Sequence, residues 1–236
     1  MKIIQEQKQT DTATITVHPV NSYREMGEFI DVPWHVNADD PMWVPPLRLE
    51  RRLHYSKFNH FFKHGEWQAW VAYKNNKPVG RISAQIDSLH QQHHGEDAGH
   101  FGSMECINDM AVFSKLILQA EAWLAARHIR YISGPFSHSI NQECGVLVDG
   151  FDSPPVVMMP HSPRWYGSLL EQQGYQPVKD LLAYWVKVDS KIPRIMQMLI
   201  RKYSKQVRLR PLNRKIFQQE IEILRDIFND AWSNNW

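Results

Sequence analysis

The stretch HFGSMECINDMAVFSKLILQAEAWLAARHIRYISGPF, residues 100–136, shows the clearest succession of strand and helix signals in the chain. Phe101–Cys106 is typical of a short strand, and Asn108-Asp109 can cap the helix that follows it. Arg130–Gly134 predicts the next strand. Between them, apolar residues recur at the spacing of one helical face: Phe113, Leu116, Ile117, Ala120, Trp123 and Leu124. The stretch therefore predicts a helix that covers a sheet.

Similar signals continue on both sides of this stretch. Two strand-like runs flank Asn75-Asn76, a pair that tolerates positive φ and predicts a tight hairpin. The expected elements outside 100–136 are a strand over 13–18, a helix after Ser22, strands over 67–73 and 79–86, a helix over 164–173 and a last strand over 183–188. This order predicts an α/β (α+β) fold with a mixed sheet covered by helices.

Composition narrows the class of protein. The chain has 236 residues, a formal net charge of +2 and 43% hydrophobic residues, which excludes a disordered or collagen-like chain. Its two cysteines form no CxxC motif, and no apolar run reaches the roughly 18 residues of a membrane span. Residues 1–12 are polar and lack the apolar core of a signal peptide. These features predict a soluble cytoplasmic protein with a flexible N-terminus.

The C-terminal part differs from the rest in charge. Nine Lys and Arg residues and no acidic residue lie within 191–215. The segment VRLRPLN, residues 207–213, matches the pattern of ITVHPVN, residues 15–21, and each precedes a helical pattern. We interpret this as an internal repeat, in which 207–236 would be the first strand and helix of a second copy. Residues 189–206 would then be a basic connector.

Several longer motifs carry a family resemblance. The hairpin at 70–87, the block at 100–136 and the ending at 169–188 resemble strands and helices of the GNAT acyl-CoA-dependent N-acyltransferases. The segments at 29–52, 139–166 and 228–236 look like a tandem-GNAT branch that includes bacterial ceramide synthases. The resemblance implies a mostly antiparallel GNAT-like sheet in residues 13–188, followed by an incomplete, apparently truncated second GNAT-like domain. It also implies N-acyl transfer from acyl-CoA to a small-molecule or lipid amine, such as a sphingoid-type base.

The resemblance also implies roles for particular residues. Glu105, at the end of the predicted fourth strand, is the candidate base, and Tyr166 is a candidate acid. The usual pyrophosphate loop corresponds to Ile107, Asn108 and Asp109, which lacks glycine and places a carboxylate where a phosphate would approach. The loop residues Asn141, Glu143 and Cys144 are candidates for substrate contacts.

Other patterns suggest alternatives. The histidines at 90, 93, 94 and 100 lie in a Gln-rich run without acidic or Cys partners, so we predict no metal site. The aromatic loop with Trp34, Met42 and Trp43 could line an acyl tunnel or make peripheral membrane contact. The whole chain could instead be a non-catalytic remnant or binding module. DNA binding through 191–215 is a third alternative, although the near-neutral total charge argues against a nucleic-acid partner.

Overall fold

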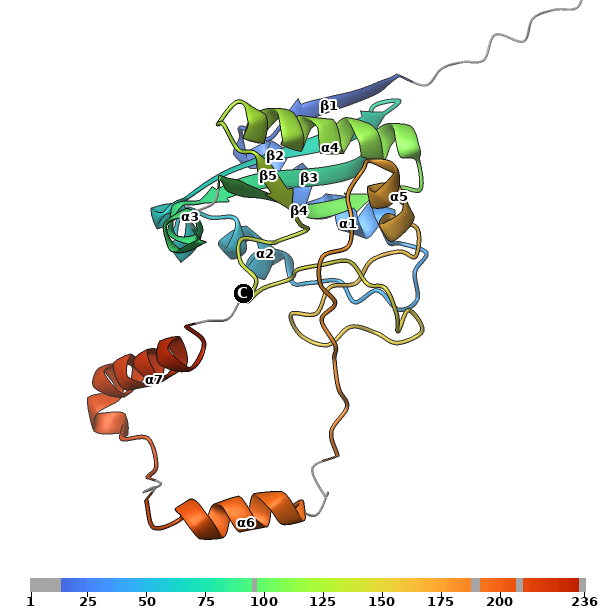
Figure 1. Ribbon diagram of the computed structural model, residues 1–236. Helices are drawn as coiled ribbons and strands as arrows, with labels where there is room; N and C mark the ends of the chain where they lie inside the picture. The colour runs from blue at the N-terminus through green and yellow to red at the C-terminus, as the bar shows by residue number, and fades with distance from the viewer. Residues whose placement is uncertain (1–13, 95–96, 188–191, 207–209, 234–236) are drawn as a thin grey trace, which may run out of the picture. The chain divides into compact units, whose positions relative to one another are not determined.

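The computed structural model describes residues 14–94, 97–187, 192–206 and 210–233. The chain divides into two compact units, Met1–Val178 and Lys179–Trp236. The first unit contains the sheet and most of the helices (Figure 1). The second contains helices α6 and α7. The two units are described separately below.

The sheet of the first unit has five strands in the order β1-β2-β3-β4-β5. They are β1 (Ile15–Pro19), β2 (Gly65–Lys74), β3 (Lys77–Asp87), β4 (Ala98–Cys106) and β5 (Tyr131–Ser133). The first three pairings are antiparallel and the pairing of β4 with β5 is parallel. Asn75 and Asn76 adopt positive φ values of 52° and 61° in the β2–β3 hairpin, as expected. The predicted mixed, mostly antiparallel sheet is confirmed.

Helices cover both faces of this sheet. The first unit contains α1 (Tyr23–Val36), α2 (Arg48–His54), α3 (Ser88–His94), α4 (Met110–Ala125), α5 (Tyr166–Gln172) and the 3-10 turn η1 (His60–Lys63). Trp70 and Ala72 of β2 belong to the hydrophobic cluster beneath α4. Ala69 and Val71 belong to the cluster beneath α1, because successive strand residues face opposite sides. The strands are therefore apolar on both faces.

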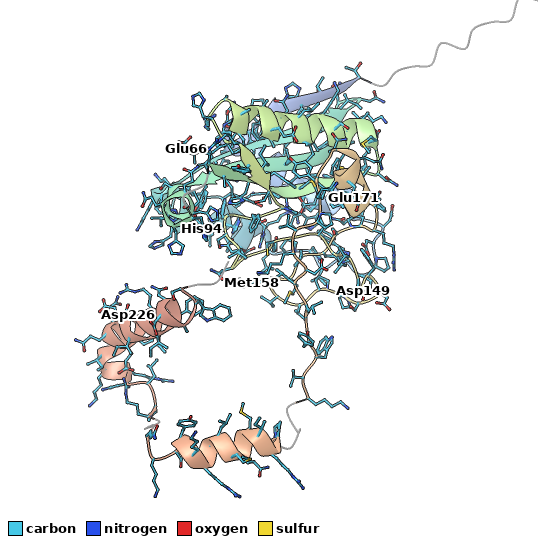
Figure 2. All side chains as sticks on the ribbon, in the orientation of Figure 1. Glu66, His94, Asp149, Met158, Glu171 and Asp226 are labelled. Atoms are coloured by element: carbon cyan, nitrogen blue, oxygen red, sulfur yellow. The ribbon has the colours of Figure 1, made fainter. Side chains whose placement is uncertain are left out.

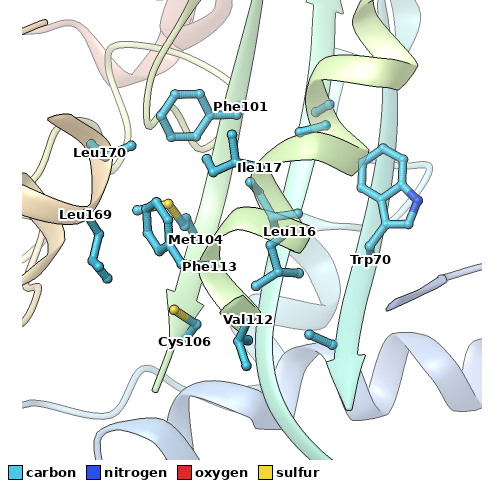
Figure 3. Packing of buried hydrophobic residues seen from close by; sticks show 14 of the residues in the cluster. Trp70, Phe101, Met104, Cys106, Val112, Phe113, Leu116, Ile117, Leu169 and Leu170 are labelled. Carbon is cyan, nitrogen blue, oxygen red and sulfur yellow. The ribbon is translucent and has the colours of Figure 1, made fainter. Parts of the chain in front are cut away.

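The predicted apolar face of α4 packs as expected. Phe113, Leu116 and Ile117 are buried, with Leu169 and Leu170 of α5 beside the same cluster (Figure 3). Trp123 is only partly buried, and the Arg127 guanidinium lies 3.8 Å from its ring centre. Trp123 therefore lies at the edge of the core.

The feature that shapes the candidate site is the separation of β4 from β5. Their parallel pairing covers only Ala98–His100 of β4. After β5 ends, residues 134–136 pass over β4. There the backbone N–H of Phe136 donates to the carbonyl of Phe101 at 2.8 Å. A Cβ on Gly102 would lie 1.7 Å from the Phe136 carbonyl oxygen, so only glycine permits this crossing. The loop after β5 thus fills the opening beside the end of β4.

The second unit contains α6 (Arg194–Tyr203), the 3-10 turn η2 (Arg214–Ile216) and α7 (Phe217–Ala231). Asp226 lies on α7 (Figure 2). The helix expected after Asn213 is present as α7. The Asn213 side chain accepts from the backbone N–H of Lys215 at the start of η2, the turn that precedes α7. Residues 207–209, which open the predicted strand of the second copy, lie outside the described residues.

The predicted closing strand at 183–188 is wrong over residues 183–187, and residue 188 lies outside the described residues. Trp185 is 92% exposed, and no strand of the described chain pairs with this segment. A segment rich in β-branched and aromatic residues forms a strand only where a neighbouring strand pairs with its backbone N–H and C=O groups. The incomplete second domain stays a prediction.

Candidate functional site

A small cavity lies beside the end of β4, where β5 has ended. Its volume is about 60 Å³. Its walls come from residues 103–105 of β4, from the loop at 135–146 and from residues 160–166. Asp149 and Met158 lie in the long connection between these two loop segments (Figure 2). Three segments that are distant in sequence therefore converge on one polar cavity.

Glu105 lines this cavity, but its carboxylate is already paired. Arg81, opposite it on β3, donates from Nε to Oε2 at 2.5 Å and from Nη2 to Oε1 at 2.9 Å. A third donor, Nη1, reaches the Phe29 carbonyl at 3.0 Å. Burial opposes the charge of Arg81, but the Glu105 carboxylate raises the pKa of the guanidinium overall. Glu105 is therefore held in place as half of a two-point ion pair.

Tyr166 reaches the same strand end from α5. Its side chain is buried, and its hydroxyl accepts from the Cys106 backbone N–H at 2.7 Å. The hydroxyl also lies 3.2 Å from the Cys106 carbonyl oxygen, to which it donates. Burial raises the pKa of Tyr166 well above its usual value, so the phenol keeps its proton. The role of Tyr166 as an acid stays a prediction, because that proton is engaged by the backbone.

The loop that carries the three predicted substrate contacts is firmly anchored. The Ser137 N–H donates to the Glu143 carbonyl at 2.9 Å, and the Gly145 N–H donates to the Pro135 carbonyl at 2.8 Å. His138 exchanges two backbone hydrogen bonds with the side chain of Gln85 on β3. These bonds close a tight loop over the sheet.

Only one of those three residues lines the cavity. Glu143 does, whereas Asn141 is exposed at the tip of the loop. The Cys144 thiol lies 3.7 Å from the Ile140 carbonyl, and burial raises its pKa, so it stays protonated. The structure thus brings Glu143 together with Glu105 and Tyr166.

Glu143 differs from Glu105 in its partners. Its carboxylate accepts one contact, from Arg51 Nη1 at 3.2 Å. Burial raises the pKa of Glu143, an effect that Arg51 partly offsets and that the nearby Glu105 carboxylate reinforces. A half-buried carboxylate with a raised pKa can accept a proton more readily than one fixed by two guanidinium contacts.

Sequence reasoning missed one residue of the cavity wall and its partner. His161 lines the cavity, and its Nε2 lies 2.7 Å from Oδ2 of Asp40. Asp40 lies in the Asp-Asp-Pro segment that follows α1, 121 positions earlier in the chain. Both segments stood among the motifs of the family resemblance, but nothing in the sequence indicated that they meet.

The predicted pyrophosphate position is occupied by the chain's own carboxylate. Asp109 caps α4 through Oδ1, which accepts from Ala111 N at 2.9 Å and from Val112 N at 3.4 Å. Its other oxygen accepts from Lys74 Nζ at 2.7 Å, and this bond is the main reason that the Asp109 pKa is lowered. Ile107 and Asn108 precede the cap. An anion approaching this helix start meets a fixed negative charge.

The remaining predicted features have ordinary local surroundings. Within the described ranges, no group of three or more His, Cys, Asp or Glu side chains could hold a metal ion. Trp34 and Trp43 pack edge to face at 5.5 Å, and Arg48 covers the ring of Trp34 at 4.2 Å. The aromatic loop is therefore folded onto α1. No helix in the described part of the chain is long and apolar enough to cross a membrane.

Comparison with known proteins gives two strong sequence relatives. Protein YghO of Escherichia coli (strain K12) is 46% identical over 90% of this chain and 55% of its own length. Bacterial ceramide synthase of Caulobacter vibrioides is 44% identical over 95% of this chain and 59% of its own length. The chain is thus a homologue of bacterial ceramide synthase, which confirms the predicted resemblance. It spans little more than half the length of these relatives. No protein-family model matches the chain.

Three solved structures show a partial likeness in fold. A predicted acetyltransferase from Clostridium acetobutylicum with acetyl-CoA has a TM-score of 0.44 and 8% identity, covering 72% of this chain and 96% of that one. An aminoglycoside N-acetyltransferase in complex with CoA has a TM-score of 0.43 and 11% identity, covering 74% of this chain and 96% of that one. A tandem GNAT protein from the clavulanic acid biosynthesis pathway has a TM-score of 0.44 and 12% identity, covering 68% of this chain and 43% of that one.

Proposed function

We propose that this chain acts as a GNAT-type N-acyltransferase, which moves an acyl group from acyl-CoA to an amine. The observation that carries the proposal is the 44% identity to bacterial ceramide synthase across 95% of the chain. That relative also suggests the acceptor, a sphingoid-type lipid base. The cavity beside β4 supports the proposal for the amine group alone, since Glu105 and Glu143 line it and can attract an ammonium group, while its volume is too small for the rest of a lipid base.

The reaction places simple demands on the site. The nitrogen lone pair of the neutral amine attacks the thioester carbon, a C–N bond forms, and the C–S bond breaks. The amine proton passes to a base, and the CoA thiolate leaves and is protonated. The 236 residues supply candidate groups for the amine and its proton. Acyl-CoA is the co-substrate in this proposal, although Asp109 makes the start of α4 a poor pyrophosphate site.

The domain organisation is part of the proposal. Residues 13–188 would form the GNAT-like domain, 189–206 a basic connector, and 207–236 the opening of a second GNAT-like domain. The structure divides into a sheet-containing unit that ends at Val178 and a helical unit that begins at Lys179, which supports a proposal of two domains. The greater length of both relatives also supports a second domain.

The test is an acyl-transfer assay on the purified 236-residue chain. Long-chain acyl-CoA and a sphingoid base are supplied together, released thiol is measured, and the N-acyl product is identified by mass spectrometry. Glu66, an exposed carboxylate that pairs with Arg127 outside the cavity, offers a control. We expect Glu105→Gln to lower the rate and Glu66→Gln to leave it unchanged. Absence of an N-acyl product with acyl chains from acetyl to long-chain would favour the non-catalytic binding module.

A further inference from the structure

The cavity contains a buried imidazole with one nitrogen unengaged. The His161 side chain is 7% exposed, and its Nε2 faces Asp40 at 2.7 Å. Its other ring nitrogen, Nδ1, is buried and has no hydrogen-bonding partner among the described residues. A buried polar atom without a partner is costly, so its presence beside a cavity points to a group that binds there.

Asp40 determines which nitrogen of His161 is free. A carboxylate cannot donate, so the short contact requires the hydrogen to be on Nε2, and Nδ1 keeps its lone pair. The other Asp40 oxygen accepts from the Met42 backbone N–H at 2.9 Å, which fixes the carboxylate in place. Burial raises the pKa of Asp40, but the hydrogen bonds from His161 and from the Met42 N–H outweigh it and lower the pKa overall. Asp40 therefore stays charged and orients the ring.

The other proton acceptors of the cavity each have at least one partner, although Glu143 has only one, at 3.2 Å. Glu105 is held by two contacts from Arg81, and Glu143 is paired with Arg51. The Ser162 hydroxyl accepts from the Leu147 backbone N–H at 2.9 Å. The Tyr166 hydroxyl is bound to the Cys106 backbone. His161 Nδ1 is thus a basic lone pair beside the cavity that has no hydrogen bond to break, and because the atom is buried, an incoming amine reaches it once the side chains that cover it move.

We propose that His161, oriented by Asp40, is the general base that accepts the proton of the acceptor amine. The inference rests on the acyl transfer proposed above. As the amine nitrogen bonds to the thioester carbon, its proton moves to His161 Nδ1 and the ring becomes an imidazolium stabilised by Asp40. The C–S bond then breaks, and the departing thiolate takes the proton from the imidazolium. Glu105 and Glu143 attract the ammonium form of the acceptor to the cavity, and this ammonium group loses one proton to solvent before the neutral amine attacks.

The chain contains a matched control for this pair. His64 Nδ1 lies 2.8 Å from Oδ1 of Asp87, and neither residue lines the cavity. In the acyl-transfer assay, His161→Gln should lower kcat by roughly 10²–10⁴-fold with little change in KM, whereas His64→Gln should leave kcat unchanged. Asp40→Asn should also lower kcat. Imidazole added to His161→Gly should restore part of the rate. Unchanged kcat in His161→Gln would overturn the inference while leaving the proposed function standing.

A second measurement does not depend on turnover. Nitrogen-15 NMR of the imidazoles in the 236-residue chain should show His161 protonated at Nε2, and Asp40→Asn should weaken that preference. A soluble short-chain amino alcohol should shift the His161 Nδ1 signal but not the His64 signals. If wild-type protein transfers no acyl group, the proposed function falls with the base, and a His161 ring that is still protonated at Nε2 and responds to the amine would leave only an amine-binding site. Protonation at Nδ1, or no response to the amine, would overturn the assignment of His161.

Discussion

Arg81 and Glu105 face each other across β3 and β4 and are joined by two hydrogen bonds of 2.5 and 2.9 Å. Only 5% of the Arg81 side chain is exposed, compared with 24% of that of Glu105. The guanidinium also stacks over the Phe29 ring at 4.7 Å. Arg81 contacts Phe29 of α1 and Glu105 lines the cavity. The pair therefore affects both the stability of the fold and the charge of the candidate site.

Removing one member of this pair should destabilise the fold. Glu105→Ala leaves Arg81 buried without its main partner, which should lower the free energy of unfolding by about 3–5 kcal/mol. Asp97→Ala, which removes the exposed contact of Asp97 with Arg130, should cost less than about 1 kcal/mol. Urea denaturation of both variants measures the difference. Equal losses would mean that the buried pair contributes no more than a surface pair.

The face of α4 can be tested with two leucines two positions apart. Leu116 is 1% exposed and Leu118 is 56% exposed. Leu116→Ala should cost about 2–5 kcal/mol, because it leaves a cavity in the core. Leu118→Ala should stay within about 0.5 kcal/mol of wild type. Thermal or chemical unfolding compares the two, and similar losses would show that α4 presents a different face to the sheet.

The loop crossing at Gly102 predicts a sharp intolerance of a side chain. Gly102→Ala places a methyl group against the Phe136 carbonyl, so we expect a loss of about 1–3 kcal/mol and displacement of the 135–146 loop. Gly27, inside α1, has open space at the same position, and Gly27→Ala should stabilise by roughly 0.5–1 kcal/mol. Melting temperatures should move in opposite directions. A neutral Gly102→Ala would mean that the loop does not lie against β4.

Binding of acyl-CoA should respond to the charge at the start of α4. We expect the wild-type chain to bind acyl-CoA weakly. Asp109→Asn keeps an N-cap side chain but removes the negative charge, so acyl-CoA should bind about 2–5-fold more tightly. Calorimetry with acetyl-CoA and a long-chain acyl-CoA measures this, with Asp97→Asn as an exposed control. Unchanged affinity in Asp109→Asn would place the pyrophosphate elsewhere.

Stability should depend on pH through three buried histidines. Burial lowers the pKa of His54 to about 3, with the His138 ring and the charges of Arg51 and Arg81 adding to the effect. Burial also lowers the pKa of His100 and His138 to about 4 each. The unfolded chain binds these protons below about pH 6.5, so protons favour unfolding. The free energy of unfolding should therefore fall from about pH 6.5 to pH 4, by up to about 1.4 kcal/mol per pH unit for each histidine.

Urea denaturation at pH 7 and pH 4.5 measures this slope. His138 has a positive φ of 73°, which asparagine tolerates, so His138→Asn removes one of the three groups without backbone strain. That variant should show a shallower slope, and exposed His93→Asn should not. Stability that stays constant between these two pH values would contradict the burial of the neutral imidazoles.

Much of the fold follows from local pattern. The helical spacing within 110–125, the Asn75-Asn76 turn and the strands on either side of it all agree with the structure. Residues 183–187 are the exception. Their aromatic and β-branched side chains predict a strand, yet no described strand pairs with them. Strand formation depends on a neighbouring edge, which is a property of the assembled sheet and not of the segment.

The candidate site was only partly predictable. Glu105 and Tyr166 were found from their place at the end of the fourth strand and in the closing helix, and both line the cavity. Their existing partners, Arg81 and the Cys106 backbone, were not predicted. His161 was missed altogether, since a lone histidine between two prolines carries no local signal.

The sequence by itself determined the hairpin of β2 and β3, the helix α4 with its apolar face, and the homology to bacterial ceramide synthase. These depend on the spacing of residues within a few turns of chain and on direct residue identity. Only the tertiary structure decided that Asp40 lies against His161 and that Arg81 occupies the Glu105 carboxylate. These contacts join residues that are 24 and 121 positions apart in the chain, so they exist only once the strands have paired and the loops have packed beside them.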